Sequence, residues 1–180
     1  MATNKNKTEE ELLEALRSGD ADVRCRAAAH RNATPEVLLI ALGDKNEYVR
    51  REAADNPNAT PQVLLIAVKD KNANVRMNAA AHPNATPEVL LAALTDKDIY
   101  VRRNAAGNRN ATPEILLAAL KEKNWEVRSG AARNPNASPE ILLLAVKDKH
   151  EWVRKAAKEA IDNDPLLQLQ VAALEAKVAS

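Results

Sequence analysis

The stretch TPEVLLIALGDKNEYVRREAADNPNA, residues 34–59, recurs along the chain with a period of 26 residues. A period of roughly 20 to 50 residues is typical of a solenoid, in which each unit buries its apolar face only against its neighbours. Two sets of evenly spaced residues mark the period. One is a set of prolines: Pro35, Pro61, Pro87, Pro113, Pro139 and Pro165. The other is a set of arginines, each preceded by Val: Arg24, Arg50, Arg76, Arg102, Arg128 and Arg154.

Each repeat is predicted to contain two short helices. Thr34 before Pro35 and Glu36 is a helix start, because the hydroxyl caps free amides, proline suits the first turn and Glu faces the positive helix end. The first helix is expected over about 35–42, packed between neighbours because its run 37–42 is apolar on nearly all sides. A turn at 44–46 leads to a second helix over about 47–55, which 56–59 ends. No segment alternates with period two, so no sheet is expected.

The repeat predicts an all-α fold, an α-solenoid of about six 26-residue two-helix repeats with terminal caps, as a single domain over 1–180. Residues 1–33 form an N-terminal cap and first unit, 34–163 five regular repeats, and 164–180 a C-terminal capping helix. Thr8 and Glu11 match a capping box. Gln168 and Gln170 stand where earlier repeats carry apolar residues, as a terminal cap requires.

Composition excludes several classes of function. The formal net charge is +1, which does not favour nucleic acid or a membrane surface, and no apolar run is long enough to span a bilayer. No N-terminal signal is apparent, so a cytoplasmic or recombinant protein is expected, as a monomer. Cys25 is the single cysteine, and no metal-ligand spacing or phosphate-binding glycine loop occurs, so no metal and no cofactor are predicted.

The recurrent charged and amide residues are predicted to be structural. A catalytic site occurs once, whereas Asp44 and its equivalents and the six arginines recur through the repeats, so we expect them to cap helices and bridge adjacent units. The Asn ladder at Asn32, Asn58, Asn84, Asn110 and Asn136 is expected to tie side chains to loop backbone. No catalytic residue and no enzymatic activity are predicted.

The pattern Asp-Lys-Asn-x-x-Val-Arg-x-x-Ala-Ala resembles the second helix of HEAT-like repeats. With Asn-Pro-Asn-Ala-Thr-Pro-Glu-Val-Leu before it, the unit looks still more like the leucine-rich repeat variant family, over about residues 8–175. The resemblance implies a right-handed superhelix with the Val-Arg helices on its inner, concave side. Framework positions barely drift between units, which indicates a consensus-engineered or designed protein.

Variation is concentrated on one face of the second helices. Positions 48, 51, 52 and 55 and their equivalents are spaced i, i+3, i+4 and i+7, and position 47 borders them. The residues predicted to bind a partner are Tyr48, Arg51, Glu52, Asp55, Asn74, Met77, Asn78, Tyr100, Arg103, Asn104, Trp125, Glu126, Arg133, Trp152 and Lys155. Aromatic residues and Arg dominate interface energetics.

The predicted function is therefore a non-enzymatic scaffold that binds a protein. Charges on this face cancel, which argues against a phosphate-binding groove. Asn78 and Asn104 could hold an extended peptide, but the Asn pattern fails at Glu52, so a folded target is favoured. The alternatives are a designed stability scaffold with no natural partner and a natural HEAT-like interaction or regulatory protein.

Overall fold

The computed structural model describes residues 7–179, and the chain divides into two compact units, 1–85 and 86–180. The described part contains 13 helices and no strand, as the sequence predicts. Unit 1 comprises α1 (Glu9–Leu16), α2 (Ala21–Ala28), α3 (Pro35–Ala41), α4 (Glu47–Asp55), α5 (Pro61–Ala67) and α6 (Ala73–Ala81). Unit 2 comprises α7 (Pro87–Leu94), α8 (Ile99–Gly107), α9 (Pro113–Leu120), α10 (Trp125–Ala132), α11 (Pro139–Ala145), α12 (Glu151–Asp162) and α13 (Pro165–Ala179).

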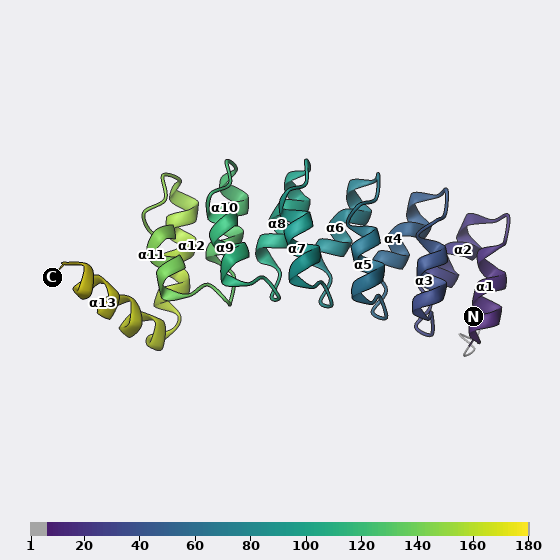
Figure 1. Ribbon diagram of the computed structural model, residues 1–180, viewed down its shortest axis with the longest axis horizontal. Coiled ribbons are helices and arrows are strands. Elements are labelled where there is room, and N and C mark those ends of the chain that lie inside the picture. Colours follow the sequence, from purple (N-terminus) through teal and green to yellow (C-terminus); the bar gives the residue numbers. More distant parts are fainter. Residues whose placement is uncertain (1–6, 180) are drawn as a thin grey trace. The chain divides into compact units, whose positions relative to one another are not determined.

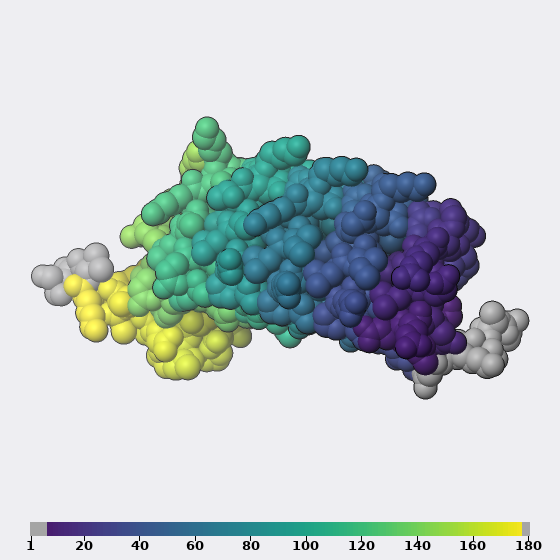
Figure 2. Space-filling model, turned by 45° about the vertical axis from the view of Figure 1, so that its right-hand side comes forward, coloured from purple at the N-terminus to yellow at the C-terminus, as the bar shows by residue number. Residues whose placement is uncertain are grey.

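Two layers of helices build each unit. In unit 1 the first helices α1, α3 and α5 pack against one another in sequence, and the second helices α2, α4 and α6 form the other layer (Figure 1). Unit 2 repeats this arrangement with α7, α9 and α11 against α8, α10 and α12. Within each unit successive repeats lie in direct contact (Figure 2). Short helices of this kind are not stable alone in water, so stacking between repeats supplies their stability.

Small apolar side chains fill the space between the layers. Leu38 of α3 and Val49, Ala53 and Ala54 of α4 are fully buried, and their equivalents recur through both units. Alanine at two successive positions of the second helix lets neighbouring helices approach closely. The core is therefore a row of nearly identical small clusters, one for each repeat.

Local capping places the helices where the sequence predicts them. Asn46 begins α4, and its side chain accepts a hydrogen bond from the amide of Tyr48 at 2.8 Å. Asn56 ends the same helix in an extended backbone conformation, before Pro57. At the N-terminus, Thr8 and Glu11 form the predicted capping box of α1.

The first helices pack between their neighbours, as the sequence predicts, but one side of each remains open. Although the run 37–42 is apolar on nearly all sides, Ile40 is 51% exposed. Equivalent or adjacent positions are also open to solvent: Ile66 in unit 1, and Leu91, Leu117 and Leu144 in unit 2. A first helix touches a first helix on either side and its own second helix, which leaves the remaining side uncovered.

The C-terminal helix α13 has the character of a cap. It packs against α11 and α12, and Gln168 and Gln170, which stand where earlier repeats carry apolar residues, are exposed. Leu166 and Leu169 are also exposed. No described helix is long and apolar enough to cross a membrane.

Candidate protein-binding surface

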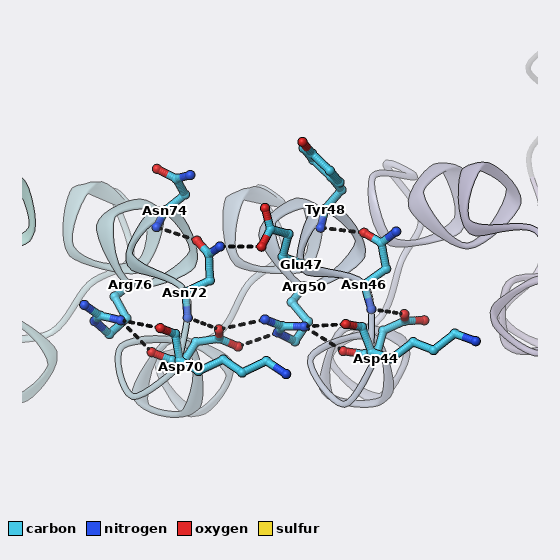
Figure 3. Close-up of polar contacts among 11 residues, drawn as sticks. Asp44, Asn46, Glu47, Tyr48, Arg50, Asp70, Asn72, Asn74 and Arg76 are labelled. Atoms are coloured by element: carbon cyan, nitrogen blue, oxygen red, sulfur yellow. Dashed lines mark hydrogen bonds and ion pairs between the residues drawn. The ribbon is translucent and has the colours of Figure 1, made fainter.

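Arginines at equivalent positions of α2, α4, α8 and α10 tie one repeat to the next. Arg50 of α4 donates from Nε to Oδ2 of Asp70 at 2.6 Å and from Nη2 to Oδ1 at 3.0 Å, as Figure 3 shows. Its third nitrogen, Nη1, donates to the backbone oxygens of Asp44 and Lys45 in its own turn, at 2.9 and 3.2 Å. One guanidinium thus clamps its own interhelical turn and the turn of the following repeat.

This junction recurs in both units. Arg24 binds Asp44 and Arg128 binds Asp148 with the same two-pronged geometry, at Nε–Oδ2 distances of 2.6 and 2.7 Å. The longer side chain of Glu122 replaces Asp in the pair with Arg102, and the distance lengthens to 3.2 Å. The prediction that Asp and Arg bridge adjacent repeats is confirmed by these pairs.

The electrostatics of the ladder keep its members charged. Burial acts to raise the pKa of Asp70, but hydrogen bonds from Arg50 and the Asn72 amide, with the charge of Arg50, together outweigh it and hold that pKa below its ordinary value. The same balance lowers the pKa of Asp44 and of Asp148. Such carboxylates are ionised at neutral pH and hold structure rather than transfer protons.

A second ladder of asparagines fixes the loops between repeats. Asn58 donates from Nδ2 to the backbone oxygens of Arg31 and Ala33 in the preceding loop, at 2.7 and 3.0 Å. Asn136 makes the equivalent bonds in unit 2. Buried Asn134 reaches the carbonyls of Ala106 and Asn108, both at 2.8 Å. The predicted role of this ladder is confirmed, and it extends across repeats.

In unit 1 the variable face of α4 and α6 is a polar surface with one exposed ring. Tyr48 is 54% exposed, and the guanidinium of Arg51 lies 5.3 Å from its ring centroid. Arg51 also pairs with Glu52 at 3.2 Å. The other predicted residues divide into exposed Asp55 and Asn74 and half-buried Met77 and Asn78.

In unit 2 the same arrangement occurs twice. Arg103 lies 5.4 Å from the ring centroid of exposed Tyr100, and Lys155 lies 5.2 Å from that of exposed Trp152. Charged contacts link the three second helices, with Arg103 3.3 Å from Glu126 on α10. At the other side, Glu159 of α12 is 4.0 Å from Arg133 and 3.8 Å from Lys155.

Other positions of this face are buried or only partly exposed to solvent. Asn104 and Glu126 are half-buried, and Ser129, which occupies a variable position, is buried and accepts a hydrogen bond from Arg133. Ala156 is buried as well, so the variable positions do not all reach solvent. A pocket of about 280 Å³ lies beside the last exposed ring and is lined by Glu151, Trp152 and Lys155.

Trp125 differs from the other three aromatic residues. It is half-buried and stacks on His150, with ring centroids 4.5 Å apart and planes nearly parallel. The equivalent pair in unit 1 is Glu47 and Asn72, joined by a 2.6 Å hydrogen bond. Trp125 therefore occupies a position whose side chain bridges to the following repeat. The sequence signal for this was a second large ring, His150, where an Asn is usual.

The single cysteine lacks the surroundings of a reactive nucleophile. Cys25 is half-buried, and its pKa is raised by burial and by nearby Glu52 and Asp22, which disfavours the reactive thiolate. Within residues 7–179 no group of three or more His, Cys, Asp or Glu side chains could hold a metal ion.

Comparison with solved structures identifies the architecture. One match is a leucine-rich repeat variant with a novel repetitive structural motif, with a TM-score of 0.65 and 24% identity over 94% of this chain and 72% of that one. The chain is a helical repeat solenoid. A second match is the Escherichia coli protein YibA, with a TM-score of 0.54 and 22% identity over 88% of this chain and 71% of that one. No model of a protein family and no curated protein sequence matches, and identities at this level establish the fold alone.

Proposed function

We propose that this solenoid is a non-enzymatic scaffold that binds a folded protein through the exposed faces of its second helices. The observation that supports this most directly is the set of exposed rings, each with a cation over it, at Tyr48, Tyr100 and Trp152. Aromatic residues and Arg contribute most of the binding energy at protein interfaces. Tyr48 and Tyr100 lie on helices whose arginines, Arg50 and Arg102, pair with the following repeat.

The local contacts favour binding at low ordering cost. A cation at i+3 restricts the rotamers of the neighbouring ring before any partner arrives, and immobilising a flexible side chain on binding costs about 0.5–1.5 kcal/mol. The charged pairs Arg103–Glu126 and Lys155–Glu159 are half-exposed or exposed, so they affect orientation and association rate more than affinity.

The kind of partner follows from charge and surface chemistry. In unit 2 the cations Arg103, Arg133 and Lys155 stand beside Glu126 and Glu159, a balance that does not suit a phosphate backbone. Isolated rings separated by polar side chains suit an irregular folded surface better than an extended peptide, which needs a regular row of donors. The near-constant framework leads us to infer that the repeat was built by consensus engineering.

Alanine at Tyr48, Tyr100 and Trp152 together tests the function. Wild-type and variant proteins, immobilised, are compared for capture of proteins from a complex mixture, beside thermal unfolding. A matched control removes similar apolar area from the first helices, by I40A, L91A and L144A. We expect the captured partner to be lost only with the ring variant, and unfolding to change little. Capture lost only in the control would move the binding surface to the first helices.

A stability scaffold with no partner is the second candidate. The repetition of the same Arg and Asn junctions in successive repeats favours it, because these contacts serve folding alone. It becomes the better account if neither wild-type nor variant captures a protein.

A further inference from the structure

The arginine ladder ends in an open rung at Arg154. This residue on α12 donates from Nη1 to the backbone oxygens of Asp148 and Lys149, at 2.8 and 2.9 Å, as the internal arginines do in their own turns. Its Nε and Nη2 make no hydrogen bond or ion pair within residues 7–179. The residue is half-exposed, and the single buried side-chain polar atom left unpaired in that part is His150 Nδ1. The Nε and Nη2 edge of Arg154 is therefore not fully buried.

Within residues 7–179 no acid takes the position of the missing carboxylate. In each internal pair the carboxylate follows its arginine by 20 residues, just after the first helix of the next repeat. The residue 20 positions after Arg154 is Leu174, which lies inside α13, because that helix runs 15 residues without a turn. The bonds from Nη1 thus hold the guanidinium as in the internal arginines, but among the described residues no carboxylate pairs with it.

Unit 1 shows what this edge is built to bind. Asp70 lies opposite Arg50 and accepts hydrogen bonds from its Nε and Nη2 (Figure 3). Two residues later, the side-chain amide of Asn72 donates to Glu47. At the C-terminal end Glu151 has the position of Glu47, and it is exposed. Arg154 thus offers the donors Nε and Nη2 for an Asp carboxylate, and Glu151 offers a carboxylate acceptor for an Asn amide. Together they match the contacts that an Asp-x-Asn turn makes in unit 1.

A second copy of this chain does not fit the site. The turn of its first repeat carries Ser18 where an Asp is needed, and Asp20 where an Asn is needed. Serine cannot form the ion pair, and the acid would face Glu151. Helix α13 also packs on α11 and α12, where the first helix of a further repeat would stack. A single turn or a peptide does not need the space that α13 occupies, so it suits the site better than a whole repeat.

We propose that the free edge of Arg154 is a carboxylate-binding site whose ligand is an Asp-x-Asn segment of another protein. Glu151 also lines the pocket beside Trp152, but the proposal does not require the aromatic face to bind a partner, and the signal of Arg154 tests it separately from the proposed function. Because Nη1 is already anchored, little ordering cost accompanies binding, and a bidentate guanidinium–carboxylate contact is stronger than a single-point ion pair. The contact is half-exposed, so we expect a dissociation constant on the order of 1 mM.

Arginine side-chain NMR on the full-length, 15N-labelled protein tests the site. The Nε–Hε signal of Arg154 is followed during titration with acetate and with the peptides acetyl-Asp-Lys-Asn-amide and acetyl-Asn-Lys-Asn-amide, with chloride at matched ionic strength as the baseline. The variant E122A serves as a positive control, because it opens the same edge of half-exposed Arg102. Arg154→Lys keeps the charge and removes the fork.

We expect a saturable shift at Arg154 with acetate and with the Asp peptide, none with the Asn peptide, and none at Arg128, whose edge is filled by Asp148. For the Lys variant, signals of the adjoining backbone report binding, which should weaken about 10-fold. Tighter binding of the Asp peptide than of acetate supports a protein segment as the ligand, and equal binding of the two would overturn that assignment. A silent Arg154 overturns the proposal, whether or not Arg102 responds in E122A.

Discussion

Removing the carboxylate of Asp148 should destabilise unit 2 far more than removing that of Glu122. Both acids pair with the arginine of the preceding repeat, but Asp148 makes two bonds, at 2.7 and 3.0 Å, and the side chains of the pair are only 4% and 11% exposed. Glu122 makes one bond at 3.2 Å, with side chains 18% and 27% exposed. Breaking a buried pair by deleting one partner costs about 3–5 kcal/mol, because the other charge stays buried.

We therefore expect Asp148→Ala to cost about 3–5 kcal/mol and Glu122→Ala to cost about 0–1 kcal/mol, the usual value of an accessible pair. For a chain of this size, 1 kcal/mol corresponds to roughly 2–4 °C in melting temperature, so the first variant should melt roughly 6–20 °C lower. Circular dichroism during thermal and urea unfolding measures both.

A double-mutant cycle separates the ion pair from loss of the turn contact. Asp148 also accepts a hydrogen bond from the amide of His150 at 2.8 Å, which contributes about 1 kcal/mol. Adding Arg128→Ala to Asp148→Ala should cost less than the sum of the single variants, because it removes the stranded charge. If Asp148→Ala and Glu122→Ala lower the free energy of unfolding equally, within about 0.5 kcal/mol, the reasoning is refuted. Burial and the second hydrogen bond would then not explain how strongly an arginine–carboxylate pair stabilises the protein.

Three further outcomes follow from the contacts. Because the folded pKa values of Asp44, Asp70 and Asp148 lie below the unfolded value of about 3.9, their contribution is complete above that pH and is lost as pH falls through the folded values. Melting temperatures measured from pH 6 to pH 2 should drop on the acid side, and the drop should shrink when the three are Asn. Asn134→Ala should cost about 2–3 kcal/mol, since it leaves two buried carbonyls without their donor, and exposed Asn136→Ala should cost less in the same urea titration. Trp125→Ala should cost about 1–3 kcal/mol through lost burial and stacking, whereas Tyr100→Ala should change stability by less than about 0.5 kcal/mol; equal effects in calorimetry would contradict the distinction drawn between the rings.

Helix positions were predictable because each boundary has its own local cause. Thr-Pro-Glu starts the first helix, an Asn or Asp caps the second in four of the regular repeats, and Asn-Pro ends it where that pair occurs. These signals act over three or four residues and need no knowledge of the neighbours. Which neighbour an arginine contacts depends on stacking, so recurrence alone could not reveal that Arg50 reaches forward to Asp70.

The open side of the first helices could not be predicted, for a related reason. The run 37–42 is continuous in apolar character, so periodicity could not distinguish the covered sides from the open one. A signal was present at equivalent positions, where Glu14, Ala92 and Ala118 stand in place of Ile40. A position that accepts both Ile and Glu is rarely a core position, because burying an unpaired carboxylate is costly.

Trp125 shows how far a one-residue difference moves a side chain. Consecutive helix residues are rotated by about 100°, so position 47 and its equivalents point to the next repeat's cap, while position 48 and its equivalents point to solvent. Glu47 with Asn72 and Trp125 with His150 are two chemical solutions for the same contact. The prediction that Trp125 binds a partner treated its position and the following one as parts of one surface. Helical periodicity alone cannot separate two neighbouring positions at the edge of a helix face.

The division of the second helix into fixed and variable positions is a division by burial. In α4, Val49, Arg50, Ala53 and Ala54 are buried and carry the core and the ladder, whereas Tyr48 and Asp55 are exposed. A substitution at an exposed position leaves both sets of inter-repeat contacts in place, so it changes stability by about 0.5 kcal/mol or less. The free energy of folding is therefore largely independent of what the exposed face presents. That independence is the property a binding scaffold needs, because its surface can then change to suit a partner without unfolding the repeats beneath it.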